Sequence, residues 1–212
     1  MQLKKIHPSL QKALIELGYH EPNELQEASY STIKSGADVV LVAPKQSGKT
    51  MNAVMHTIQK LQQPVGESTR ALFLVNSKED GLEVMEWFEK LGKYNQLRVY
   101  FSHDKSDMDE DKNLISLGND VIVSTPTKIN DLFATAGFNL NTVRFLVIDD
   151  ADLQLKNRWE NLYQRLFISI VKTQVVLNAS EVTEKLEFFV DKYLTEPLWL
   201  ESEDEAETYD NE

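Results

Sequence analysis

Residues 38–50 read Asp38-Val39-Val40-Leu41-Val42-Ala43-Pro44-Lys45-Gln46-Ser47-Gly48-Lys49-Thr50. The apolar run at 39–42 predicts a buried strand, and the Ser-Gly-Lys-Thr ending predicts a tight loop that opens a helix. Backbone N–H groups at a helix N-terminus, together with roughly half a positive charge from the helix dipole, attract an anion. The stretch therefore predicts a phosphate-binding loop, in which Lys49 reaches the β- and γ-phosphates and Thr50 offers its hydroxyl to magnesium.

Further apolar runs recur along the chain, separated by helical patterns. The candidate strands are 39–42, 71–75, 97–101, 121–124, 145–148, 175–177 and 198–200. Several are apolar throughout, which is typical of strands buried on both faces of a parallel sheet. The apolar stripes at helical spacing are Leu82-Met85-Phe88-Leu91 and Leu186-Phe189-Val190-Tyr193. This alternation predicts one three-layer α/β/α domain over residues 1–200, with a mostly parallel sheet of about seven strands.

The charge of the chain is strongly negative, at −12. Seven of the carboxylates fall in residues 201–212, which contain no basic residue, so the remainder is only mildly acidic. We expect this segment to be a disordered acidic tail. The alternative is that it masks a basic surface elsewhere on the chain.

The composition also limits the cellular setting. The chain has no cysteine, no apolar run near the roughly 20 residues of a membrane span, and no signal-peptide core at its start. We therefore expect a cytoplasmic protein, monomeric and without membrane association.

A second informative segment is Phe145-Leu146-Val147-Ile148-Asp149-Asp150-Ala151-Asp152. Carboxylates directly after a buried strand can hold magnesium opposite a phosphate-binding loop, although acidic residues there can also simply cap a helix. Ser124-Thr125-Pro126 likewise follows a candidate strand. Because ligands of parallel sheets bind at the carboxyl ends of the strands, we expect all three segments to converge on one edge.

The order of these motifs resembles the first RecA-like domain of the DEAD-box RNA helicases, over roughly residues 6 to 200. The matching segments are Ile6–Leu10, Leu17–Pro22, Gln26, Ala43–Thr50 (motif I), Ser77–Glu79 (motif Ia), Ser124–Ile129 (motif Ib), Asp149–Asp152 (motif II), Asn178–Ser180 (motif III, after the strand at 175–177) and Tyr193–Pro197. The resemblance implies a P-loop NTPase fold, ATP and Mg²⁺ as cofactors, and RNA as a partner.

The resemblance also implies a role for each matching residue. The cofactor-binding residues are Gln26 for the adenine edge and Lys45, Gln46, Ser47, Gly48, Lys49 and Thr50 for the phosphates. Magnesium would be held by Thr50 and Asp149, and catalysis would use Lys49, Asp149 and Asp150. The RNA-binding residues would be Ser77, Lys78, Thr125, Pro126 and Lys128. Asp152, Asn178 and Ser180 would couple motif II to RNA, and the family's stacking aromatic would fall near Met1.

Two departures from the family touch its chemistry. Gln46 stands where the family has glycine, and if that position requires positive φ, the side chain costs on the order of 1 kcal/mol. Asp150 stands where the family has the glutamate that positions the attacking water. Asp is one methylene shorter, and an error near 1 Å in a positioning group can cost about 100-fold in rate. Lys78 and Lys128 replace arginines and lose their planar fork.

We expect no second RecA-like domain of the family after Pro197. We expect a complete short protein, slightly in preference to a fragment cut at the interdomain linker. Either way, the second domain's arginines would have to be supplied by a partner, so the lone domain should show weak or no unwinding. The alternative function is a non-catalytic, degenerate helicase domain that acts as a scaffold for protein or RNA. A different P-loop ATPase is a second alternative, which the motif order argues against.

Overall fold

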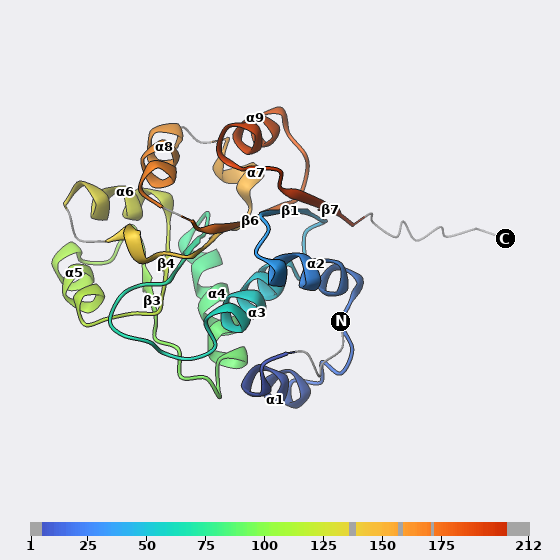
Figure 1. The fold of residues 1–212 in the computed structure, drawn as a ribbon. Coiled ribbons are helices and arrows are strands. Elements are labelled where there is room, and N and C mark those ends of the chain that lie inside the picture. Colours follow the sequence, from blue (N-terminus) through green and yellow to red (C-terminus); the bar gives the residue numbers. More distant parts are fainter. Residues whose placement is uncertain (1–5, 136–138, 157–158, 171, 203–212) are drawn as a thin grey trace.

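A computed structural model describes residues 6–135, 139–156, 159–170 and 172–202. Its described strands form a single seven-stranded parallel sheet in the order β3-β4-β2-β5-β6-β1-β7 (Figure 1). The strands are β1 (Val39–Val42), β2 (Ala71–Leu74), β3 (Val99–Ser102), β4 (Val121–Ser124), β5 (Phe145–Ile148), β6 (Gln174–Ala179) and β7 (Leu198–Glu201). The α/β fold is RecA-like, as the motif order predicts.

Helices cover both faces of this sheet (Figure 1). One face carries α1 (Pro8–Glu16), α2 (Glu24–Ser35), α3 (Lys49–Leu61) and α4 (Lys78–Leu91). The other carries α5 (Met108–Ser116), α6 (Pro126–Ala134), α7 (Ala151–Gln154), α8 (Glu160–Ser169) and α9 (Glu184–Tyr193). None of the helices in the described ranges combines the length and hydrophobicity that crossing a membrane requires.

The uniform apolar character of the strands has a direct structural reason. In β1, Val39 and Leu41 pack into the core beneath α1–α4, whereas Val40 and Val42 pack into the core on the opposite face. Both faces are thus removed from water, which is why neither set can be polar. The sequence prediction of a sheet buried on both sides is confirmed.

Four strands differ from their predicted bounds: β2 ends one residue earlier, at Leu74, β7 ends one residue later, at Glu201, and β3 and β6 differ more. β3 begins at Val99 rather than at residue 97, because Arg98 just before it is held at Asp120, whose carboxylate receives both its backbone N–H and its Nε. β6 extends to Ala179, so Asn178 lies inside the strand and not in a loop after it. Asn178 therefore has a fixed direction, set by the pairing of Leu41 with Asn178 across β1 and β6.

The apolar stripe predicted on α4 is partly wrong. Leu82 is 53% exposed, and the buried line of the helix runs through Gly81, Val84 and Phe88 instead. A Cβ on Gly81 would lie 2.1 Å from the ring of Phe101, so the helix approaches β3 with its glycine. That close approach rotates Leu82 toward solvent. The stripe predicted on α9 is confirmed for Leu186, Phe189 and Val190, and Tyr193 packs against it.

Candidate functional site

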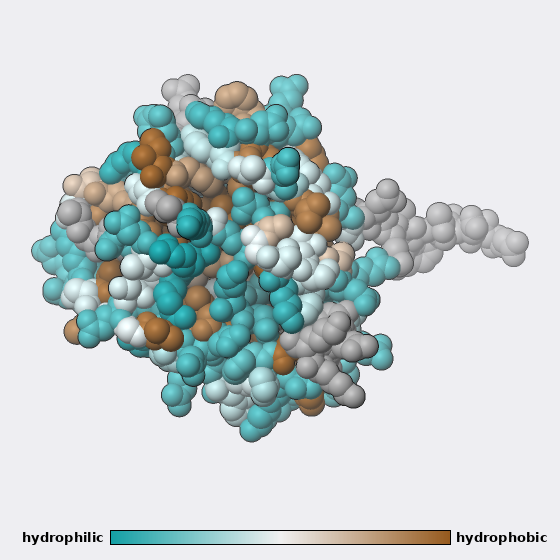
Figure 2. All heavy atoms as spheres, viewed as in Figure 1, coloured by the Kyte–Doolittle hydropathy of each residue, from teal (hydrophilic) through white to brown (hydrophobic). Residues whose placement is uncertain are grey.

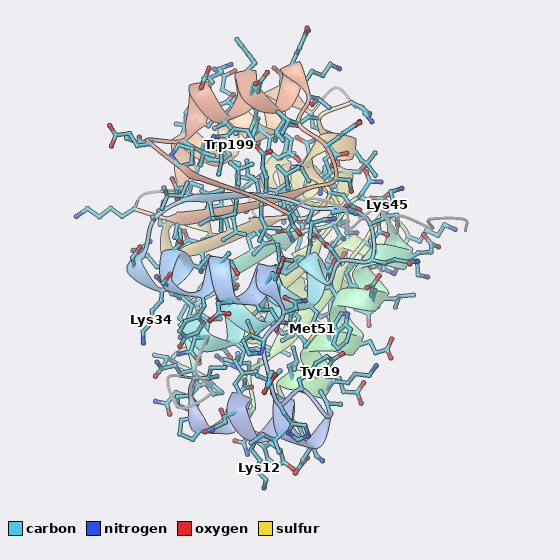
Figure 3. The ribbon with its side chains drawn as sticks, turned by 90° about the vertical axis from the view of Figure 1, so that its right-hand side faces the viewer. Lys12, Tyr19, Lys34, Lys45, Met51 and Trp199 are labelled. Carbon is cyan, nitrogen blue, oxygen red and sulfur yellow. The ribbon has the colours of Figure 1, made fainter. Side chains whose placement is uncertain are left out.

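A cleft of about 650 Å³ opens at the carboxyl edge of the sheet. It lies between the loop after β1, the start of α2 and the first turns of α4. Its lining includes Tyr19, Gln26, Lys45, Gln46, Ser47, Gly48, Lys49, Thr50, Met51, Asp80, Glu83, Trp87 and Asp150. In Figure 3, Tyr19 and Met51 lie near each other, while Lys45 extends from the loop at the sheet edge. The volume falls in the range of small-ligand sites.

The backbone of the loop after β1 has the shape of an anion cradle. Gln46 and Gly48 both adopt positive φ, at 66° and 86°. Gly48 is the N-cap of α3 and brings no side chain to cap it, so the first N–H groups of this 13-residue helix are not used by a capping side chain. Because Gln46 does adopt a positive φ, the cost on the order of 1 kcal/mol that was conditional on it applies to this glutamine.

Lys49 is buried, with an exposed fraction of 6%. Its ammonium donates to the carbonyl oxygen of Pro44 at 2.6 Å and also to that of Ala43. Burial lowers the pKa of Lys49, and the nearby carboxylates of Asp150 and Asp149 oppose that shift. The ammonium of Lys49 is therefore held by carbonyl oxygens of its own loop. A bound phosphate would have to replace these oxygens as its partners.

Asp149 directly follows β5, and two side chains donate hydrogen bonds to its carboxylate. Thr50 donates its hydroxyl to Oδ2 at 2.8 Å, and Asn178 donates Nδ2 to Oδ1 at 2.6 Å. Burial raises the pKa of Asp149 to about 6, although both hydrogen bonds act in the opposite direction. The structure thus brings together two residues 99 positions apart, as the two-motif prediction expects.

The chemistry of this pair fits magnesium. A hydroxyl and a carboxylate are hard oxygen ligands, and Mg²⁺ is usually held by one or two carboxylates with the remaining ligands from water and phosphate. Over the described part of the chain, no cluster of three or more His, Cys, Asp or Glu could hold a metal ion. A magnesium ion here would therefore depend on Thr50, Asp149 and the oxygens of a bound phosphate.

Asp150 directly follows Asp149 in the chain and lines the cleft. It adopts a left-handed conformation, with φ 49° and ψ 48°, which Asp tolerates better than most residues. Burial raises the pKa of Asp150, and repulsion from Asp152 and Asp80 adds to the effect. Asp150 thus lies in the cleft at the start of α7.

The coupling residues are connected differently from the expectation. Asp152 accepts the backbone N–H of Ser180 at 3.1 Å, so motifs II and III do meet. Asn178, however, contacts Asp149 and the carbonyl oxygen of Lys49, and not Asp152. Because Asn178 lies within β6, its amide is directed at motif I and at the first carboxylate of motif II. The prediction that Asn178 acts through Asp152 is corrected accordingly.

Gln26 is buried at the far end of the cleft, in the first turn of α2. Its Oε1 accepts the backbone N–H of Asn23 at 3.2 Å, while Asn23 accepts the N–H of Gln26 at 2.8 Å. This reciprocal capping box fixes the side chain and engages its Oε1 at the start of α2.

Sequence reasoning missed two aromatic residues of the cleft. It placed the stacking aromatic near Met1, which lies outside the described residues, whereas Tyr19 lines the cleft seven positions before Gln26. The signal was the aromatic after Gly18, whose φ of 85° turns the chain there. Trp87 of α4 also lines the cleft.

The residues expected to contact RNA are mostly not at the surface. Ser77 caps α4 and donates its hydroxyl to Asp80, and Lys78 is exposed. Thr125 and Pro126, at the start of α6, are both buried. Thr125 donates its hydroxyl to Asp104 at 2.6 Å.

Lys128 requires a correction. It is only 3% exposed, and its ammonium lies 2.6 Å from Asp111 and 2.7 Å from the carbonyl oxygen of Ser106. Burial acts to raise the pKa of Asp111, but hydrogen bonds from Lys128, Tyr100 and Ser106 outweigh it and leave that pKa below its usual value. A buried lysine needs such a partner. Lys128 is therefore a structural cation in this conformation and offers no free charge to a phosphate.

Comparison with known proteins agrees with this geometry. A sequence model of the family described as DEAD/DEAH box helicase matches residues 23–181, well over half of the chain. The chain is 25% identical over 194 residues to "ATP-dependent RNA helicase eIF4A" of Scheffersomyces stipitis, covering 91% of this chain and 49% of the relative.

Two further relatives give similar values. The "Putative DEAD-box ATP-dependent RNA helicase 29" of Arabidopsis thaliana is 30% identical over 193 residues, which covers 90% of this chain and 23% of the relative. The "ATP-dependent RNA helicase DeaD" of Mycobacterium tuberculosis is 29% identical over 196 residues, covering 92% and 35%. The chain thus spans about half the length, or less, of the curated relatives it matches.

Proposed function

The chain belongs to the DEAD/DEAH box helicase family, and on that premise we propose that it binds an adenine nucleotide with Mg²⁺ in the cleft. The curated relatives are named as ATP-dependent RNA helicases, which supports ATP as the nucleotide and RNA as a partner. Within this proposal the lone domain binds RNA weakly and unwinds duplexes weakly or not at all.

One observation carries the proposal: the 2.8 Å hydrogen bond between Thr50 and Asp149. It joins the helix that follows the phosphate loop to the strand end that bears motif II. A hydroxyl and a carboxylate held together beside a helix N-terminus serve as a site for a metal-bound phosphate chain.

Within this proposal, different residues along the cleft contact the base, the phosphates and the attacking water. Tyr19 offers a ring face to a base, and Gln26 offers its amide donor to the base edge. The N–H groups that open α3 and the ammonium of Lys49 face the phosphates, where developing negative charge is stabilised. Asp150 would orient a water molecule. A Mg²⁺ ion held by Thr50 and Asp149 would neutralise part of the negative charge of the phosphates.

The second candidate function is a scaffold that keeps the fold without the reaction. Three observations favour it: the positive φ of Gln46, the short side chain of Asp150, and the burial of Lys128 against Asp111. A scaffold would not need an exchangeable lysine in the phosphate loop. The two functions therefore differ in what happens when that lysine is removed.

Calorimetric titration with ATP and Mg²⁺ tests the proposal. The expected result is saturable binding that falls at least about tenfold in Lys49→Ala, since a charge-assisted contact to phosphate is lost. Lys105→Ala is the control, because Lys105 is an exposed lysine that does not line the cleft. An equal loss in both variants, or no heat at millimolar ATP, would leave the scaffold as the better account.

A further inference from the structure

A second hollow lies between α9, the end of α7 and the start of α8. It shares no lining residue with the nucleotide cleft. It measures about 250 Å³. Its floor contains Leu155, Tyr163 and Phe189, and its rim contains Lys185, Phe188 and Lys192 of α9. We call this hollow the α9 groove. It belongs to the sheet face that carries α5–α9, and the cleft is lined from the opposite face.

The rim of the α9 groove is a regular stripe. Lys185, Phe188 and Lys192 are spaced by three and four residues and so share one face of the helix. Phe188 is 69% exposed, an unusual state for a phenylalanine beside a hollow. The ammonium of Lys192 lies 5.9 Å from the centre of the Phe188 ring.

The two lysines of this stripe have no carboxylate partner within salt-bridge distance among the described residues. Lys185 donates only to the carbonyl oxygen of Lys156, at 3.5 Å. Two cations without a counter-charge therefore flank an exposed aromatic ring. Such a surface suits a ligand that combines carboxylates with an aromatic or aliphatic group.

The chain itself contains a segment of this chemistry. Residues 203–212 read Glu203-Asp204-Glu205-Ala206-Glu207-Thr208-Tyr209-Asp210-Asn211-Glu212, with six carboxylates, no basic residue and one tyrosine. The segment follows Ser202, directly after β7, and Figure 1 shows the end of β7 on the side of the sheet near α9. Ten residues span up to about 33 Å, and a helix is about 10–12 Å across.

We propose that residues 203–212 dock in the α9 groove, with Tyr209 against Phe188 and neighbouring carboxylates on Lys185 and Lys192. Exposed ion pairs are individually weak, and salt screens them. Docking is nevertheless favoured because the segment is tethered, at an effective concentration on the order of millimolar. The acidic segment thus has a specific surface to cover, in addition to its effect on solubility.

The floor of the groove connects this docking site to motif II. Tyr163 donates its hydroxyl to Gln154 Oε1 at 2.6 Å, and Gln154 donates Nε2 to the carbonyl oxygen of Asp149 at 2.7 Å. A segment packed against Tyr163 is therefore two hydrogen bonds from Asp149. Docking would restrain the start of α7, which carries Asp150 at its N-cap.

RNA is the competing ligand for a lysine–aromatic surface, and the structure disfavours it. Glu184 also lines the groove, and α9 carries Glu187 and Asp191 on the adjacent face. A nucleic-acid surface is usually a continuous basic patch. A short peptide can place two of its carboxylates on the lysines and its tyrosine beside Phe188, away from the acids of the adjacent face, whereas every unit of a phosphate backbone carries a charge.

The test uses the full chain, which has no cysteine. A nitroxide on Asn211→Cys should broaden backbone amide signals of α9, most strongly around Lys185–Lys192. At about 50 mM salt we expect signal intensity there to fall at least twofold, and to recover at about 500 mM as the charges are screened. Lys185→Glu/Lys192→Glu should abolish the broadening. Lys105→Glu/Lys172→Glu, two exposed lysines outside the groove, should leave it unchanged.

Several results would overturn the proposal. No broadening of α9 at low salt would exclude docking, as would broadening that survives the charge-reversed pair. Broadening seen only between differently labelled copies would assign the groove to a second copy of the chain. Binding of a single-stranded RNA that is lost in Lys185→Glu/Lys192→Glu, with no approach of the label, would make the groove an RNA site. Phe188→Ala should reduce the broadening several-fold, because the aromatic contact is part of the site.

Discussion

The nucleotide cleft and the region of motif Ib differ in how their charged side chains are used. In the cleft, Asn178 donates to Asp149 and to the carbonyl oxygen of Lys49, and Thr50 also donates to Asp149. Asp150 lines the opening of the cleft. At motif Ib, Lys128 is closed off by Asp111 in a buried ion pair. Matching residue types therefore gave a chemical site in one region and a structural bond in the other. A motif assigns a position, whereas its neighbours decide whether the side chain is available.

The largest expected effect comes from breaking the ion pair of the motif Ib region. Asp111→Ala should lower the free energy of unfolding by about 3–5 kcal/mol, because it leaves the ammonium of Lys128 buried without its carboxylate. Denaturation in urea measures this. Asp109→Ala, on the exposed first turn of the same helix, is the control and should change stability little. Equal losses of stability in the two variants would show that buried Lys128 does not depend on the carboxylate of Asp111.

The next effect concerns the metal-binding pair of the cleft. Thr50→Val removes the hydroxyl and keeps the volume and branching of the side chain, so it should weaken binding of ATP with Mg²⁺ by about 10–100-fold. Binding of ATP in the presence of a chelator should change much less. Calorimetry with and without Mg²⁺ makes the comparison. Thr57→Val, on the same helix with its hydroxyl bonded to Ala53, is the matched control.

Acid should weaken the helices behind the cleft through His56. This side chain of α3 lies against Ser29 and the ring of Tyr30, and burial lowers the pKa of His56 to about 3. The unfolded chain takes up the proton first as pH falls, near 6.5. The stability that the neutral ring contributes is thus complete above pH 6.5 and falls by about 1.4 kcal/mol per pH unit below it.

Protonation of Asp149 changes the free energy of unfolding in the opposite direction over part of this pH range. The variant His56→Gln is therefore compared with the wild type as a difference in unfolding free energy at the same pH. Below pH 6 the folded state protonates Asp149 before the unfolded chain does, which adds stability. The difference in unfolding free energy between the wild type and His56→Gln should therefore change with pH below 6.5. A flat difference for His56→Gln would mean that the ring is not buried neutral. The Lys128–Asp111 pair is unaffected until pH approaches 4.

The smallest effect tests backbone strain in the phosphate loop. Gln46→Gly should raise the free energy of unfolding by up to about 1 kcal/mol and tighten nucleotide binding several-fold, because glycine adopts positive φ freely. Gln62→Gly and Gln96→Gly relieve the same strain at φ 62° and 58°, outside the cleft. These controls should gain stability without any change in binding. A gain in binding in all three would show that the effect is not local.

The sequence was sufficient for the parts of the structure that depend on pattern. The bounds of β1, β4 and β5 were predicted residue by residue, since each is an apolar run, closed in β4 by Ser124, of the kind that both faces of a parallel sheet require. The meeting of Thr50 and Asp149 also followed, because parallel strands bring their carboxyl ends to one edge.

The failures share a physical cause: they depend on tertiary neighbours. Leu82 is exposed because Gly81 fits beneath Phe101, and Lys128 is buried because Asp111 lies across from it. Tyr19 enters the cleft because of a turn at Gly18, 31 residues before Lys49 in the chain. None of these relations is a periodicity, so they could not be read from spacing alone.

The most direct test of the contrast is calorimetry of one protein sample with two ligands in turn. The sample is titrated first with ATP and Mg²⁺, and then with a single-stranded RNA, in both the presence and the absence of the nucleotide. The account predicts saturable nucleotide binding together with RNA binding at least about tenfold weaker, a difference of ~1.4 kcal/mol or more. Tight RNA binding without nucleotide, or RNA binding without any nucleotide binding, would contradict it.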